Sequence, residues 1–119
     1  MDENVRRERM LQGREAFNRR EFYEAHEFWE DVWNEIDDPE RRWVQGLIQV
    51  ATGMHKLVNG RPDVCATLLG KALAKLGDAP AALDGVDVAG ARRGAERVLG
   101  AIQSGEPPRV SWVWLKSLA

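Results

Sequence analysis

The residues best suited to chemistry lie between Tyr23 and Trp33, where a histidine, a glutamate and a tryptophan follow helical spacing. Because an α-helix turns about 100° per residue, His26, Glu30 and Trp33 fall on one side of such a helix, at the edge of its apolar stripe. An imidazole and a carboxylate one turn apart can bind a divalent metal together, or the carboxylate can hold the imidazole in one tautomer and make it a base. His26 and Glu30 are therefore the candidate site, and a divalent metal is the cofactor that they suggest.

A metal or ligand site needs more groups than this pair supplies. Aromatic rings nearby can form the wall of a cleft, and the glutamines of the next segment can donate amide hydrogen bonds to Glu30 or to a bound ligand. We expect the segment 39–59 to pack against this helix and to contribute such groups. The neighbouring candidates are Tyr23, Glu27, Trp33, Gln45, Gln49 and His55.

The same residues also have an interpretation without chemistry. Histidine and glutamate one turn apart are common on helices, and two ligands do not make a metal site. His26 would then lie at the edge of the core and form, with Glu30 and Gln49, a buried polar network that fixes helix register. His55, near the middle of an apolar stripe, also suits a histidine packed in a core. In this interpretation the protein is a non-catalytic structural or interaction module.

Helical periodicity dominates the chain, whereas the alternation typical of strands is almost absent. Asp38, followed by Pro39, is expected to cap the third helix, and Asp87 is expected to cap the fifth. We predict an all-α fold, a compact single-domain bundle of about five helices over residues 1–119. The expected helices cover about residues 2–18, 21–36, 39–59, 62–76 and 88–104, with a loop over 78–85 and an extended tail over 106–119.

The third segment, residues 39–59, is apolar on two sides and should be the central helix, whereas the highly charged first segment should be peripheral. Gly46 and Gly53 lower helix propensity, and we explain them by the close approach of a neighbouring helix. The remaining polar strip of the central helix consists of Gln45, Gln49, Thr52 and Lys56.

The C-terminal segment begins with a proline pair and should lie extended across the bundle. Trp112 and Trp114 have two alternative roles there. They can cover their own chain, or they can contact a protein partner or a second copy of the chain.

Three segments resemble a known family: FYEAHEFWEDVW, then RRWVQGLIQVATGMHKLVNG, and later LDGVDV. They are similar to the family catalogued as domain of unknown function 309, whose motif is a His, three residues, a Glu, two residues, and Trp or Tyr. The motif falls on His26, Glu30 and Trp33, and the segment from Gln45 to Gln49 also fits. The resemblance covers about residues 14–102. It implies a small all-helical protein of bacteria and archaea, with metal binding suggested for the motif but no established activity.

Composition limits the class of protein. The 119 residues, of which 44% are hydrophobic, fit one domain with a substantial core. The 17 Lys and Arg against 19 Asp and Glu leave a net charge of −2, which favours neither nucleic acid nor an anionic membrane as partner. The single cysteine cannot form an internal disulfide, no run approaches the ~18 apolar residues of a membrane span, and the charged N-terminus does not look like a signal peptide. We therefore expect a cytoplasmic protein.

Other chemistries lack their residues. Glu30 stands where a zinc-peptidase helix has its second histidine, and no glycine pattern is suited to cradle a phosphate. The central helix offers Gln where a di-metal helical bundle needs Glu, so one mononuclear site is the most that the sequence allows. Arg92, Arg93 and Arg97 form a small basic patch that we interpret as a solvated face. The sequence assigns no reaction.

Overall fold

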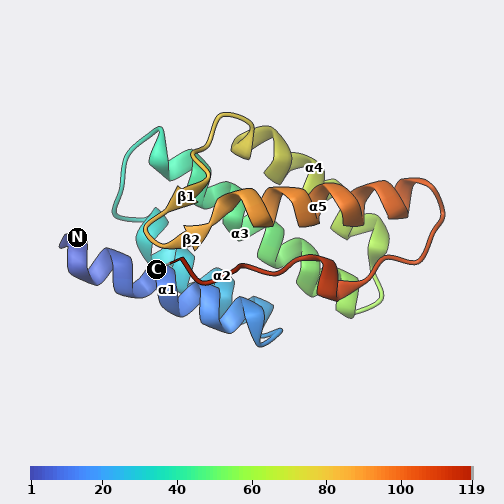
Figure 1. Ribbon diagram of the computed structural model, residues 1–119, viewed down its shortest axis with the longest axis horizontal. Helices are drawn as coiled ribbons and strands as arrows, with labels where there is room; N and C mark the ends of the chain where they lie inside the picture. Colours follow the sequence, from blue (N-terminus) through green and yellow to red (C-terminus); the bar gives the residue numbers. More distant parts are fainter. Residues whose placement is uncertain (119) are drawn as a thin grey trace.

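Five α-helices carry most of residues 1–118, the part of the chain described by the computed structural model (Figure 1). They are α1 (Glu3–Asn18), α2 (Phe22–Trp33), α3 (Glu40–Val58), α4 (Pro62–Leu76) and α5 (Val88–Gln103). The predicted all-α bundle of about five helices is confirmed. A short hairpin, β1 (Ala82–Leu83) and β2 (Val86–Asp87), precedes α5, and a 3-10 turn, η1 (Val110–Trp112), interrupts the tail.

The hairpin corrects the prediction of a loop over residues 78–85. Leu83 pairs with Val86 in an antiparallel register, and the two residues between them have positive φ angles, 49° at Asp84 and 83° at Gly85. An Asp-Gly pair with two positive φ angles is the sequence that favours a two-residue hairpin turn. The strands are too short to show the alternation by which strands are recognised in a sequence.

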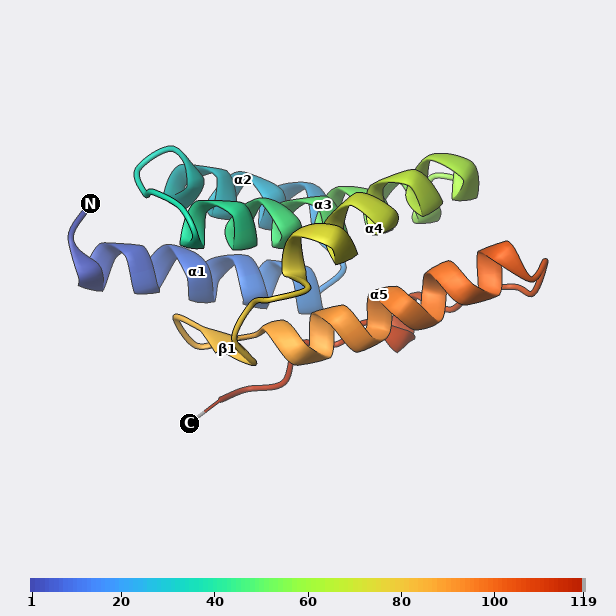
Figure 2. The same cartoon turned by 90° about the horizontal axis from the view of Figure 1, so that it is seen from above.

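Helix α3 lies between its neighbours, as its two apolar sides predict. It packs against α2 on one side and α4 on the other, while α1 packs on α2 and α5 on α4. Figure 2 shows α1 and α5 on the same side of the layer formed by α2, α3 and α4. Cβ atoms added to Gly46 and Gly53 would lie 2.7 Å from Leu76 Cγ and 3.1 Å from Leu69 Cδ2. The two glycines therefore allow the close approach of α4 that we expected.

Two helix ends differ from the predicted ones. Helix α2 ends at Trp33 rather than at Ile36, and α3 begins at Glu40 with Pro39 as its cap residue. Asp38 does not cap α3, since no side chain caps that helix. Proline disfavours the helical conformation in the residue before it, so Asp38 stays outside the helix.

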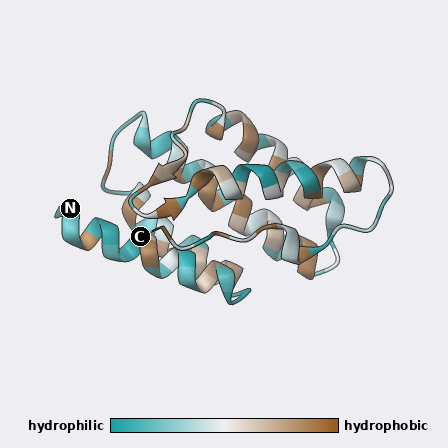
Figure 3. Cartoon of the chain, viewed as in Figure 1, coloured by the Kyte–Doolittle hydropathy of each residue, from teal (hydrophilic) through white to brown (hydrophobic). Residues whose placement is uncertain are grey.

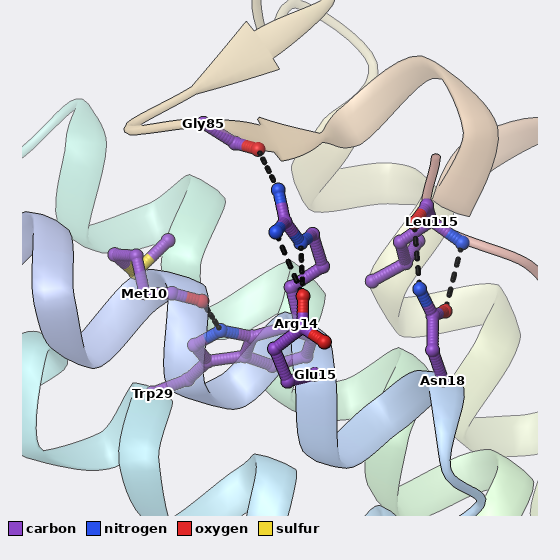
Figure 4. A network of polar contacts seen from close by, with 7 residues as sticks. All are labelled: Met10, Arg14, Glu15, Asn18, Trp29, Gly85 and Leu115. Atoms are coloured by element: carbon purple, nitrogen blue, oxygen red, sulfur yellow. Dashed lines mark hydrogen bonds and ion pairs between the residues drawn. The ribbon is translucent and has the colours of Figure 1, made fainter. Parts of the chain in front are cut away.

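A tryptophan at the centre of the core joins α1 to α2. Trp29 is fully buried, and its indole Nε1 donates a hydrogen bond to the carbonyl oxygen of Met10 at 3.1 Å (Figure 4). Phe17 stacks on the Trp29 ring with 6.0 Å between centroids. Gly13 leaves the room that the indole occupies, because a Cβ there would lie 2.1 Å from Trp29 Nε1. The outer face of α1 is hydrophilic, as expected for a peripheral helix (Figure 3).

The tail lies extended across its own chain, as predicted. Val113 and Leu115 are buried, and Asn18 both donates to the Leu115 carbonyl oxygen and accepts from the Leu115 N–H (Figure 4). Asp87 caps α5 as predicted, accepting from Gly90 N–H at 2.9 Å, and its second oxygen accepts from the backbone N–H of Lys116 at 3.3 Å. The tail therefore contributes two side chains, Val113 and Leu115, to the core.

We predict opposite effects for two glycine-to-alanine changes. Gly13→Ala should lower the free energy of unfolding by about 1–3 kcal/mol, because the new methyl group collides with the Trp29 indole. Gly70→Ala should raise it by about 0.5–1 kcal/mol, because a Cβ at Gly70 meets nothing within 4 Å and alanine favours the helix. Urea denaturation measures both. Equal effects of the two changes would contradict the tight contact at Gly13.

A second prediction concerns the tail. Truncation after Gly105 should lower the free energy of unfolding by about 3 kcal/mol or more, because Val113 and Leu115 are lost from the core. The matched control is Trp114→Ser in the full chain, because the Trp114 side chain is 53% exposed and its loss should change stability little. A truncated chain with unchanged stability and a different association state, measured by ultracentrifugation, would contradict this role.

Candidate functional site

The predicted His26–Glu30 pair is formed on α2. His26 Nε2 lies 2.8 Å from Glu30 Oε2, and His26 Nδ1 lies 3.2 Å from the Tyr23 carbonyl oxygen. Both partners are acceptors, so both contacts are hydrogen bonds only when both ring nitrogens carry protons. The side chains are 20% and 49% exposed, respectively. The pair is therefore a half-buried group at the rim of the helix, and not the buried network of the alternative interpretation.

Tyr23 extends this rim toward α3. Its ring centroid lies 5.2 Å from that of His26 and 5.8 Å from that of His55. His55 is only half-buried, with Asn59 Nδ2 3.4 Å from its Nε2. His55 thus belongs to the open end of the α2/α3 seam instead of the centre of an apolar stripe. Tyr23, 51% exposed, lies between the two imidazoles.

A shallow pocket lies beside the pair. It has a volume of about 210 Å³ and is lined by Glu30 and Trp33 from α2 and by Gln45 and Ile48 from α3. Three of the candidate residues from the sequence, Glu30, Trp33 and Gln45, therefore come together here from two helices. Within residues 1–118, no hydrogen bond joins Gln45 to Glu30, so both polar side chains remain available to a ligand.

Two buried polar atoms, one on α2 and one on α3, have no hydrogen-bond partner among residues 1–118. They are Trp33 Nε1, a donor, and Gln49 Oε1, an acceptor. Leaving a buried polar atom unpaired costs about 1–3 kcal/mol, so native proteins rarely contain one without a reason. The expected contact between Gln49 and the His26–Glu30 pair is not formed.

The two predicted metal ligands, His26 and Glu30, lie together, but no third ligand joins them among residues 1–118. No group of three or more His, Cys, Asp or Glu side chains that could hold a metal ion occurs in residues 1–118. Glu27 does not join His26; it lines a separate surface pocket with Glu24, Phe28 and Asp31. This placement agrees with helix geometry, because adjacent residues on a helix point about 100° apart.

Sequence reasoning missed three basic residues next to the pocket. Arg41 lies over the Trp33 ring at 3.9 Å from its centroid, Arg42 forms an ion pair with Asp78, and Lys75 comes from α4. The Arg-Arg pair before Trp43 was a visible signal in the sequence. No signal in the sequence indicated Lys75, since its position at the pocket depends on the register between α3 and α4.

Neither Cys65 nor the basic patch on α5 forms a site. Cys65 is fully buried, and desolvation raises the pKa of its thiol to about 11, so the thiol is unreactive. Two of the three arginines of the α5 patch are used within the fold. Arg92 donates to the Leu76 carbonyl oxygen at 2.7 Å, and Arg97 lies over the Trp112 ring.

Comparison with known proteins gives a family and a relative. Residues 10–68 match the sequence model of a family described as a domain of unknown function (DUF309). An uncharacterized protein of Aquifex aeolicus (strain VF5) is 32% identical over 98 residues, which are 82% of this chain. The chain spans only 29% of the length of that relative. None of the helices in residues 1–118 has the length and apolar character needed to cross a membrane.

We expect His26→Ala to leave the fold intact. Its contact with Glu30 is open to solvent, so the free energy of unfolding should fall by no more than about 1 kcal/mol. Trp29→Ala, at the buried position one turn away, should cost about 3–5 kcal/mol and calibrates the assay. Thermal and urea denaturation measure both. A loss of several kcal/mol in His26→Ala would show that the histidine serves the fold.

Proposed function

Residues 10–68 make this chain a member of the DUF309 family, and we propose that its α2/α3 pocket binds a small polar ligand. The observation that carries the proposal is the unpartnered indole Nε1 of Trp33, a residue that lines the pocket; Gln49 Oε1, one turn along α3 from the pocket-lining Gln45, likewise has no partner among residues 1–118. A ligand that carries an acceptor for the indole N–H and a donor for the amide oxygen would pair with both atoms.

Each residue has a role in this proposal. Glu30, half exposed at the rim, accepts a hydrogen bond from a hydroxyl or an amine of the ligand. His26 holds the Glu30 carboxylate in place through its 2.8 Å contact and acts as a positioning residue. Ile48 supplies an apolar wall, and the Gln45 amide can donate or accept. The pocket thus combines apolar contact with a few directed polar groups, as small-molecule sites do.

A resident divalent metal is less well supported than an organic ligand. His26 and Glu30 have no third side-chain ligand of the usual kinds within residues 1–118, and both imidazole nitrogens already face acceptors. A metal would have to displace one of those contacts and complete its coordination with water. We propose a cytoplasmic, prokaryotic setting, because a single free cysteine suits a reducing compartment and the family resemblance implies bacteria and archaea.

The second candidate function is a protein-interaction module. The observation in its favour is Trp114, a large side chain that is 53% exposed although its neighbours Val113 and Leu115 are buried. Exposed tryptophans are frequent anchors at protein interfaces. A partner or a second copy of the chain would then cover the tail, and Trp114→Ser would abolish association without changing the α2/α3 pocket.

The test of the ligand proposal uses Gln49→Met, which replaces the unpartnered amide by an apolar side chain of similar length. This variant should be up to about 1–3 kcal/mol more stable than the unmodified protein in the absence of ligand, because a buried polar atom without a partner is removed. It should also lose ligand binding. Protein incubated with a polar metabolite extract, gel-filtered and analysed by mass spectrometry reports which compounds are retained.

The matched control is Glu24→Gln, on a different surface of α2, which should retain the same compounds as the unmodified protein. Parallel samples with Zn²⁺ or Mn²⁺ test the metal alternative by elemental analysis. Equal retention by Gln49→Met and the unmodified protein would contradict the proposed site. An ordered water bonded to both Trp33 Nε1 and Gln49 Oε1 in a high-resolution crystal structure would contradict it as well.

A further inference from the structure

The pocket of the proposed function continues into a second one. This second pocket, of about 290 Å³, shares Trp33 and Gln45 with the first and is otherwise lined by Asp38, Arg41, Arg42 and Lys75. Trp33 and Gln45 thus form the boundary between two adjoining hollows. A ligand that is long enough to carry several hydrogen-bonding groups can occupy both pockets.

The two hollows carry opposite charge. Glu30 lies in the first, whereas the second has three cationic side chains and one carboxylate. Arg42 is already paired, with its Nη2 2.9 Å from Asp78 Oδ2. Within residues 1–118, neither Arg41 nor Lys75 forms an ion pair, and only Asp38 in the pocket opposes them. The second hollow therefore has an excess of positive charge near Arg41 and Lys75.

Arg41 is held in position before any ligand arrives. Its guanidinium carbon lies 3.9 Å from the centroid of the Trp33 ring, a cation–π contact. A guanidinium fixed against a ring loses less conformational entropy when it binds, and its planar N–H groups match a carboxylate or a phosphate in a bidentate manner. Arg41 also belongs to the first turn of α3, where the helix dipole favours negative charge.

We propose that the ligand of the α2/α3 pocket carries a carboxylate or phosphate group, which binds between Arg41 and Lys75 in the second hollow. This inference rests on the proposed function and names the class of ligand. The anionic group lies at the Arg41 end because Glu30 repels it from the other end. The rest of the ligand reaches past Trp33, where the unpartnered indole N–H requires an acceptor, and places a hydroxyl or an ammonium group at Glu30.

The experiment titrates the full chain, labelled with ¹⁵N, with inorganic phosphate and separately with acetate. Sodium chloride at the same ionic strength is the reference. The chain has five tryptophans, so five indole Nε1–H signals are expected, and Trp33→Phe identifies the relevant one. We expect a saturable shift of the Trp33 indole signal and of the Arg41 Nε–H signal with at least one of the two anions.

Charge variants on one helix provide the matched comparison. Lys75→Gln should weaken anion binding about tenfold, because a charge-assisted hydrogen bond is lost. Lys71→Gln, which removes an exposed lysine one turn earlier on α4, should leave the affinity unchanged. The anion that binds more tightly identifies the ligand's charged group as a phosphate or a carboxylate.

Two outcomes would overturn the inference. One is the absence of a saturable shift with phosphate and with acetate beyond that of chloride. The other is an equal loss of affinity in Lys75→Gln and Lys71→Gln, which would show a general charge effect. Failure of the proposed function is measured by a different experiment, in which Gln49→Met would retain the same metabolites as the unmodified protein. The anion titration is independent of that experiment, because Gln49 does not line the pocket that contains Arg41 and Lys75.

Discussion

Close packing of α3 against α4 is the constraint on which the position of the site depends. Without Cβ atoms at Gly46 and Gly53, α4 approaches until Leu69 and Leu76 fill the space beside the α3 backbone. This contact buries one side of α3, and α2 buries another. Gln45, a polar residue of α3, is left at the α2/α3 seam, where it lines the pocket with Glu30 and Trp33. Lys75, next to Leu76, owes its place at the second hollow to the same contact.

Partial burial decides what the His26–Glu30 pair can do. A fully exposed ion pair of this kind contributes almost nothing to stability, and a fully buried one must compensate the desolvation of both groups. With side-chain exposures of 20% and 49%, the pair keeps its 2.8 Å contact while Glu30 still reaches solvent. The arrangement suits a carboxylate that must hold one orientation and still contact a ligand.

Local patterns in the sequence predicted the local features of the fold. Helical periodicity gave the helices, and the cap at Asp87 and the two α3 glycines were explained correctly, because each depends on residues within a few positions of one another or on one packing face. The role expected of Glu27 stays a prediction, and this residue lines a different pocket from Glu30. Lys75 was missed, because no local signal fixes how far α4 slides along α3. Residue-level contacts between helices therefore had to come from the structure.

The unpartnered atoms favour the proposed binding site over a structural network. A network that only fixes helix register gains from pairing every buried donor and acceptor, since each unpaired one costs stability. Here Glu30 contacts His26, yet Trp33 Nε1 on α2 and Gln49 Oε1 on α3 have no partner among residues 1–118. An apolar residue at position 49 would remove that cost without disturbing the core, because Gln49 is only half-buried. Polar groups kept at such a cost are typical of sites whose partner arrives from outside the chain.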